Sequence, residues 1–139
     1  MKKVLYLFLI SFGLYGCRTE AVDIRQLNGY WEIEKVVTAS GETKVFTGNE
    51  TLDFFSLTDS LHGFRVKVMP NILGTFSHNN TTESLKVYAE DGQWKIRYHT
   101  PFAEWEESLL KLTENTLELQ SAENTLYIYK RYLPDSIIP

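Results

Sequence analysis

The chain has 139 residues, 14 basic against 18 acidic side chains, a formal net charge of −4 and one cysteine, Cys17. Its length suits one domain with a hydrophobic core, and one cysteine leaves no pair for an internal disulfide. An acidic chain without a basic cluster argues against nucleic-acid binding, which requires neutralisation of phosphates. Packing of its many aromatic residues must therefore stabilise the fold.

The N-terminal segment is typical of a secretory signal. Lys2 and Lys3 precede an apolar run over residues 4–14 that ends in small residues. The run is shorter than the about 20 apolar residues of a membrane span. "LYGC", residues 14–17, resembles the lipobox of bacterial lipoproteins, with leucine three residues before the cysteine and glycine directly before it. Tyr15 departs from the small or β-branched residue usual at its place.

This resemblance implies a lipid anchor. In that family diacylglycerol alkylates the cysteine thiol, the preceding segment is removed, and the new amino terminus is acylated, typically with palmitate. Two or more acyl chains hold a protein firmly on a membrane. We therefore expect a signal peptide over 1–16, a lipidated tether over 17–26 and a protein of the cell envelope. Arg18, in place of the aspartate that marks inner-membrane retention in some bacteria, favours the outer membrane and leaves the leaflet open.

Two other interpretations of Cys17 remain. The segment before it is also compatible with an ordinary cleaved signal followed by an incidental cysteine. A catalytic thiol has less support, because no neighbouring residue would lower its pKa.

After the tether, short β-rich runs alternate with turn residues. Asp23 is a candidate N-cap for one helical turn ending at Leu27. Asp91-Gly92 lies between two alternating runs, a strong hairpin signal. The predicted strands occupy 30–38, 43–46, 51–57, 64–68, 83–89, 93–100, 109–112, 117–120 and 125–132. Eight to ten strands at this spacing predict an all-β antiparallel sandwich or barrel.

Residues 101–112 fit two structures. Phe102, Trp105, Leu109 and Leu112 recur at helical spacing, and Pro101 suits the first position of a helix. We favour a loop and a strand, because the tight turn after Leu112 leads directly into another alternating run.

Three segments resemble the small bacterial lipocalin-like lipoproteins: "LNGYWEIEKV" (27–36), "SLLKLTENTLELQ" (108–120) and "TLYIYKRY" (125–132). The resemblance implies an up-and-down β-barrel over 27–133, followed by a tail over 134–139. Such a barrel encloses packed side chains or one small ligand. It also implies that Trp31 lies at the closed end of the barrel, covered by Arg131 or Lys130.

The residue pattern offers no recognisable active site. His62, His78 and His99 are scattered, without the spacing of a zinc site. Glu106 and Glu107 are adjacent, so on a strand they point to opposite faces and do not form an acid–base pair. We expect a protein that is not an enzyme and that needs no metal or cofactor, with an exposed loop at 78–82. Residues 59–61 and 135–137 resemble the O-glycosylation motifs of some Gram-negative bacteria.

Six aromatic residues are candidates to line a ligand pocket: Trp31, Phe54, Phe64, Trp94, Tyr98 and Tyr129. The same residue types also fill a solid barrel. Our leading hypothesis is a membrane-anchored carrier of a small apolar or amphipathic molecule. The alternative is an interaction or inhibitor module with a solid core, whose long loops around 47–50 and 69–80 contact another envelope protein.

Overall fold

The computed structural model describes residues 21–71 and 73–134, so Cys17, the predicted signal and residues 135–139 lie outside the described part. The chain forms a short 3₁₀ helix and nine strands. These are η1 (Ile24–Leu27), β1 (Gly29–Val37), β2 (Thr43–Val45), β3 (Leu52–Leu57), β4 (His62–Pro70), β5 (Phe76–Glu90), β6 (Gln93–His99), β7 (Glu104–Leu112), β8 (Thr116–Ser121) and β9 (Leu126–Tyr132). Within this part, no helix has the length and apolar character needed to span a membrane.

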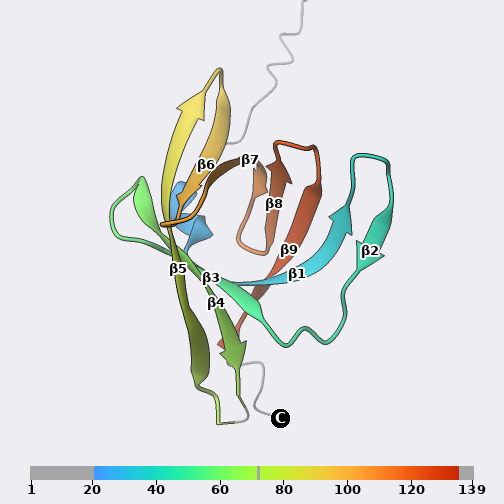
Figure 1. The fold of residues 1–139 in the computed structure, drawn as a ribbon, viewed down its shortest axis with the longest axis vertical. Helices are drawn as coiled ribbons and strands as arrows, with labels where there is room; N and C mark the ends of the chain where they lie inside the picture. Colours follow the sequence, from blue (N-terminus) through green and yellow to red (C-terminus); the bar gives the residue numbers. More distant parts are fainter. Residues whose placement is uncertain (1–20, 72, 135–139) are drawn as a thin grey trace, which may run out of the picture.

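Eight of the strands close into an antiparallel barrel. Hydrogen bonding runs in the order β1-β3-β4-β5-β6-β7-β8-β9, and β9 pairs again with β1 (Figure 1). β2 is an additional strand that pairs with the far end of β1. The predicted all-β up-and-down barrel is confirmed. The ambiguous segment at 101–112 contains strand β7, because its residues pair on both sides with β6 and β8.

The turns follow the local chemistry of the sequence. Asp91 and Gly92 have positive φ angles of 51° and 75°, which match the two-residue hairpin turn favoured by Asp-Gly. Asn124, in the turn between β8 and β9, also has a positive φ of 64°, a conformation that asparagine tolerates. The hairpin predicted at Asp91-Gly92 is therefore present, between β5 and β6.

The strands bury apolar side chains on both faces of the sheet. The interior of the barrel holds Ile24, Leu27, Trp31, Phe55, Leu85, Val87, Ile96, Tyr98, Leu109, Leu112, Leu117, Leu119 and Tyr129. A second cluster consists of Leu52, Val66 and Val68, with Tyr30, Phe54, Phe64, Phe76 and Tyr132 packed against it. Because successive residues of a strand point to opposite faces, β3 contributes Phe55 to the interior and Leu52 to the second cluster, whereas the apolar residues of β4 belong to the second cluster. We call the second group the outer cluster.

The strand bounds correct two loop predictions. Residues 78–82 lie within β5, and the loop predicted at 69–80 is shorter, because β4 continues to Pro70 and β5 begins at Phe76. The hairpin between them extends beyond the body of the barrel (Figure 1). A bulge between the Val66 and Val68 pairings interrupts its register, and bulges bend strands. Phe76 stacks on Tyr30 with 4.4 Å between ring centroids, so aromatic contacts hold this hairpin to the barrel.

Helix η1 plugs one end of the barrel. Asp23 caps it by accepting a hydrogen bond from the Arg25 N–H, as predicted. Ile24 and Leu27 are buried, and the Trp31 indole Nε1 donates to the Leu27 carbonyl at 2.9 Å. The folded domain thus begins within the segment predicted as tether.

Arg131 covers this closed end. Its guanidinium carbon lies 4.1 Å from the centroid of the fully buried Trp31 ring, and the group donates to the carbonyls of Gln26, Asn28 and Glu114. Gly29 makes room for it: the backbone there has φ of +120°, and a Cβ atom would lie 2.8 Å from Arg131 Nη1. The positive φ at residue 29 and the approach of the Arg131 side chain together favour glycine at this position.

Replacing Arg131 with alanine is expected to lower the free energy of unfolding by about 2–3 kcal/mol, because three carbonyls lose a charged donor and Trp31 loses its cover. Urea denaturation followed by tryptophan fluorescence measures the change. Lys130→Ala is the matched control: Lys130 is half-exposed and makes one 3.5 Å ion pair with Glu32, so its loss should cost about 0.5 kcal/mol or less. Equal effects of the two substitutions would contradict the closing role of Arg131.

Candidate ligand-binding site

The barrel is hollow on the side of Trp31 that faces away from η1, and Trp31 itself lines part of the hollow. Two cavities, of about 190 and 390 Å³, share the residues Asp53, Lys67, Tyr127 and Tyr129 and so adjoin one another. The larger cavity falls within the roughly 300–1,000 Å³ typical of ligand pockets. We call the two together the barrel mouth.

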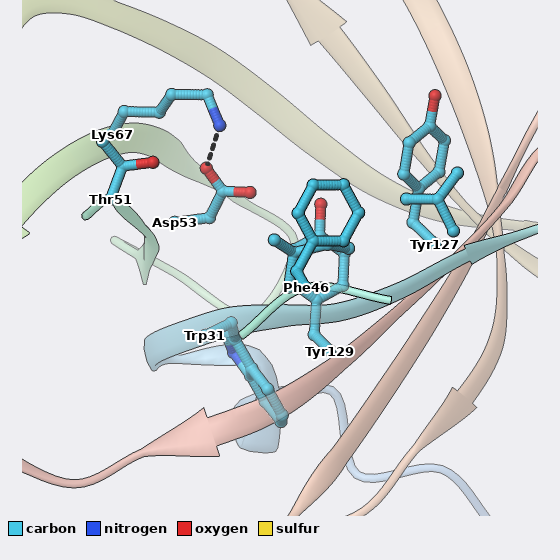
Figure 2. A pocket seen from close by; sticks show the side chains of 9 residues that line it. Trp31, Phe46, Thr51, Asp53, Lys67, Tyr127 and Tyr129 are labelled. Carbon is cyan, nitrogen blue, oxygen red and sulfur yellow. Dashed lines mark hydrogen bonds and ion pairs between the residues drawn. The ribbon is translucent and has the colours of Figure 1, made fainter. Parts of the chain in front are cut away.

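The smaller cavity lies where β1 and β3 separate. These strands share three residue pairs, whereas β1 and β9 share seven, because the far end of β1 pairs with β2 instead. The Asn49 side-chain amide donates to the Ile33 carbonyl at 2.7 Å in this gap. The cavity is lined by Trp31, Ile33, Val36, Phe46, Thr51, Asp53, Lys67, Tyr127 and Tyr129. Figure 2 shows the rings of Phe46, Tyr127 and Tyr129 beside the Lys67–Asp53 pair.

The larger cavity combines aromatic and charged walls. Its lining residues are Asp53, Arg65, Lys67, Trp105, Glu107, Ser121, Glu123, Tyr127 and Tyr129. Charged side chains inside a barrel are costly unless they are paired. The pairs they make therefore determine what the cavity can bind.

Arg65 is the centre of the interior charges. Its Nε donates to Glu83 Oε2 at 2.5 Å, and its Nη1 lies 3.8 Å from Glu107 Oε2. The guanidinium also stacks over the Tyr98 ring, with its central carbon 4.2 Å from the ring centroid. The Arg65 side chain is 13% exposed, so these neighbours, rather than bulk water, solvate its charge.

A second pair lies nearer to solvent. Lys67 Nζ donates to Asp53 Oδ1 at 3.0 Å, and the lysine side chain is 62% exposed whereas that of Asp53 is 7% exposed. Lys67 thus reaches from the rim inward to a buried carboxylate. The Tyr129 hydroxyl faces the same carboxylate from β9.

Burial changes the ionisation of the groups in this interior. It raises the pKa values of the Tyr98 and Tyr129 hydroxyls well above the usual range, so both are neutral donors. Burial also raises the pKa of the Glu107 carboxyl, although Arg65 and the Tyr98 hydroxyl oppose the shift. Glu107 also lies farther from its cation partner, at 3.8 Å from Arg65, than Glu83 does from Arg65 or Asp53 from Lys67.

The structure separates the six predicted lining residues. Trp31 and Tyr98 are fully buried in the interior, Tyr129 lies there beside them, and Trp94 packs against the same cluster. Of the six, Trp31 and Tyr129 contact the barrel mouth.

Phe54 and Phe64 are a correction to that prediction. They pack in the outer cluster, on the opposite face of the sheet from Phe55 and Arg65. The alternation of β4 is confirmed, but the prediction that Phe64 faces the inside of the barrel is wrong. Tyr30, Phe76 and Tyr132 pack against the apolar face of β4. The face with Arg65 and Lys67 therefore points inward.

Sequence reasoning missed the polar residues of the barrel mouth. Asp53, Arg65 and Lys67 are not among the predicted lining residues, because charged side chains on the strands of a small barrel usually face solvent. Glu107 was correctly placed on the face opposite Glu106: the latter contacts Arg97 outside the barrel at 3.1 Å. One sequence feature could have indicated this arrangement. Both faces of β3 are apolar, so a second layer of side chains must cover the face that does not point into the barrel.

The remaining polar candidates lie at the surface. His62 and His99 are exposed and lie beside Asp59 and Glu104 respectively. Among residues 21–71 and 73–134, no three histidine, cysteine or acidic side chains come together as metal ligands.

Comparison with known proteins defines the class of fold. No protein-family model matches the chain, and no curated protein matches it. The structure is similar to that of a lipocalin-like protein from Bacteroides uniformis, with a TM-score of 0.51, 15% identity, and coverage of 77% of this chain and 99% of that one. It is also similar to an uncharacterized protein from Bacteroides eggerthii, with a TM-score of 0.50, 13% identity, and coverage of 76% and 99%. At these identities the likeness concerns the fold alone, which is a lipocalin-like β-barrel.

Opposite pKa shifts at two adjacent glutamates predict opposite pH effects on stability. The raised pKa of Glu107 means that the native state holds its proton more tightly. Wild-type stability should therefore fall, relative to Glu107→Gln, as pH rises from 4.5 through the raised value, by at most about 1.4 kcal/mol per pH unit. The Tyr88 hydroxyl, together with Arg97 and Lys95, lowers the pKa of Glu106, so its contribution should be present above pH 4.5 and lost below it.

Urea denaturation of wild type, Glu107→Gln and Glu106→Gln over this pH range measures both effects. The difference between wild type and Glu106→Gln should rise with pH, whereas the difference between wild type and Glu107→Gln should fall. The same sign for both variants would contradict the assignment of Glu107 to the interior.

Proposed function

We propose that this protein is an exported, lipid-anchored, non-catalytic carrier that holds a small amphipathic molecule in the mouth of its barrel. The observation that carries the proposal is the pair of adjoining cavities opposite the closed end. One wall of each is aromatic and the other is charged, so an apolar body and a polar head group both find partners. Burial of apolar ligand surface would contribute about 25 cal/mol per Å² before ordering costs.

The anchor rests on residues 1–17. The basic head, the apolar run and the lipobox-like "LYGC" support acylation at Cys17. The barrel begins within a few residues of this point, at Val22, which packs against the core beside η1. A chain of four residues between Cys17 and Val22 spans roughly 14 Å when extended. The tether would thus hold the closed end of the barrel near the membrane surface, with its mouth directed away.

Metabolic labelling tests the anchor. A bacterial host expressing the full chain with an alkyne analogue of palmitate should label the wild type and fail to label Cys17→Ala, because that variant has no thiol to alkylate. Ser11→Ala changes the apolar run and leaves "LYGC" intact, so it should keep the label. An unlabelled wild type, or label that survives Cys17→Ala, would reject this anchor.

Binding of a neutral fluorescent probe, N-phenylnaphthylamine, tests the barrel mouth. The Cys17→Ala chain, purified without detergent, should enhance the probe's fluorescence. Tyr127→Ala should weaken binding about tenfold, because Tyr127 lines both cavities.

Tyr88→Ala is the matched control for this measurement. Tyr88 contacts Arg97 and Glu106 on the outer face, so its loss should leave the affinity unchanged. Absence of binding, or equal losses in both variants, would count against a ligand at the mouth.

The β4–β5 hairpin supports a second candidate, an interaction module. Leu73 is 82% exposed and Met69 is 44% exposed near its tip, and both lie in the segment predicted as a binding rim. Exposed apolar side chains on a projecting element suit contact with another envelope protein. The probe experiment separates the two candidates, since this one requires no small ligand.

A further inference from the structure

We infer that the molecule held in the barrel mouth carries a positive charge, as a primary amine or a quaternary ammonium does. This inference rests on the proposed carrier function and names the chemical class of its ligand. It follows from the balance of charge around the larger cavity, from one carboxylate oxygen that is open to this cavity, and from the aromatic walls.

The charges that line the larger cavity do not cancel. Asp53 and Glu107 supply two buried carboxylates and Arg65 and Lys67 supply two cations, whereas the third lining carboxylate, Glu123, is exposed to solvent. Glu83, at 2.5 Å from Arg65, adds a fourth carboxylate behind the wall. Opposite charges in a poorly solvated interior attract one another far more strongly than in water. The site therefore has an excess of negative charge that a cationic ligand would neutralise.

Among the partly or fully buried carboxylates around the cavity, Glu107 is the one without a short ion pair. Arg65 makes its short ion pair with Glu83 and stays 3.8 Å from Glu107, and Lys67 pairs with Asp53 at 3.0 Å. Glu107 receives one short hydrogen bond, from the neutral Tyr98 hydroxyl at 2.8 Å. Its ion pair and its hydrogen bond both use Oε2. Among the described residues, no buried side-chain oxygen lacks a partner, so Oε1, which takes part in neither contact, is open to the solvent of the cavity that Glu107 lines.

The walls around this carboxylate suit a cation. Trp105, Tyr127 and Tyr129 line the same cavity, and the electron-rich faces of such rings attract ammonium groups. Trp105 also stacks on Tyr98 with 5.3 Å between the centroids, so the ring is held by the residue that hydrogen-bonds Glu107. A carboxylate and aromatic faces around one cavity are the combination that recognises an organic cation with an apolar body.

An anionic amphiphile such as a fatty acid fits less well. To reach Arg65 it would have to displace Glu83 or approach Glu107, and to reach Lys67 it would compete with Asp53. Each of these places a second negative charge beside a carboxylate, which is unfavourable.

Three ligands with the same apolar body test the inference: phenylbutylamine, phenylbutanol and phenylbutyrate. Isothermal titration of each into the Cys17→Ala chain at neutral pH should give the tightest binding for the amine, about tenfold above the alcohol, and the weakest for the carboxylate. In the Cys17→Ala/Glu107→Gln chain the affinity for the amine should fall about tenfold, to near the affinity for the alcohol, because the partner carboxylate is gone.

Glu106→Gln, on the same background, is the matched control. It removes an equal charge from the adjacent residue, which faces Arg97, Tyr88 and Lys95 outside the barrel, so the preference for the amine should persist. If the alcohol or the carboxylate binds as tightly as the amine, or if Glu107→Gln leaves the preference intact, the inference is wrong and the carrier function stands. If none of the three ligands binds, the carrier function fails together with it. The ranking of the three ligands in the Cys17→Ala chain does not depend on the Glu107→Gln substitution. It therefore tests the inference even if the Glu107→Gln chain unfolds.

Discussion

The pairing of β9 with β1 is the constraint on which the rest of the structure depends. Seven residue pairs join the last strand to the first and turn a sheet into a closed barrel. Closure removes the two free edges and shields the inner face from water. It also brings Arg131 over Trp31, and it places Tyr129 opposite Asp53 at the barrel mouth. The closed end and the candidate site thus both depend on the pairing of β9 with β1.

The same closure explains how charged residues come to face inward. An apolar interior can fill an eight-stranded barrel, as it does around η1. Toward the mouth, Arg65, Glu107, Asp53 and Lys67 replace apolar side chains, and their mutual pairing makes the burial tolerable. The outer cluster supplies the apolar packing that the inner face of β4 gives up.

The geometry links the proposed anchor to the proposed binding site. The N-terminal segment meets the barrel at η1, on the closed end, while both cavities lie at the other end. Acylation at Cys17 would accordingly present the mouth to the surrounding compartment rather than to the bilayer. A carrier of a polar, charged molecule needs this arrangement more than a carrier of a membrane lipid does.

The sequence by itself determined the strands, the Asp91-Gly92 turn, the cap at Asp23 and the class of fold, because these depend on local alternation and backbone preference. It also predicted that Glu106 and Glu107 face apart. Only the tertiary structure decided which face of each strand is inside: Phe54 and Phe64 lie on the outer face, in the outer cluster with Tyr30 and Phe76, and Arg65 and Lys67 lie within. Alternation has a period of two whichever face of the strand is buried. Which face points into the barrel depends on the residues that cover each face, and those residues come from distant parts of the chain.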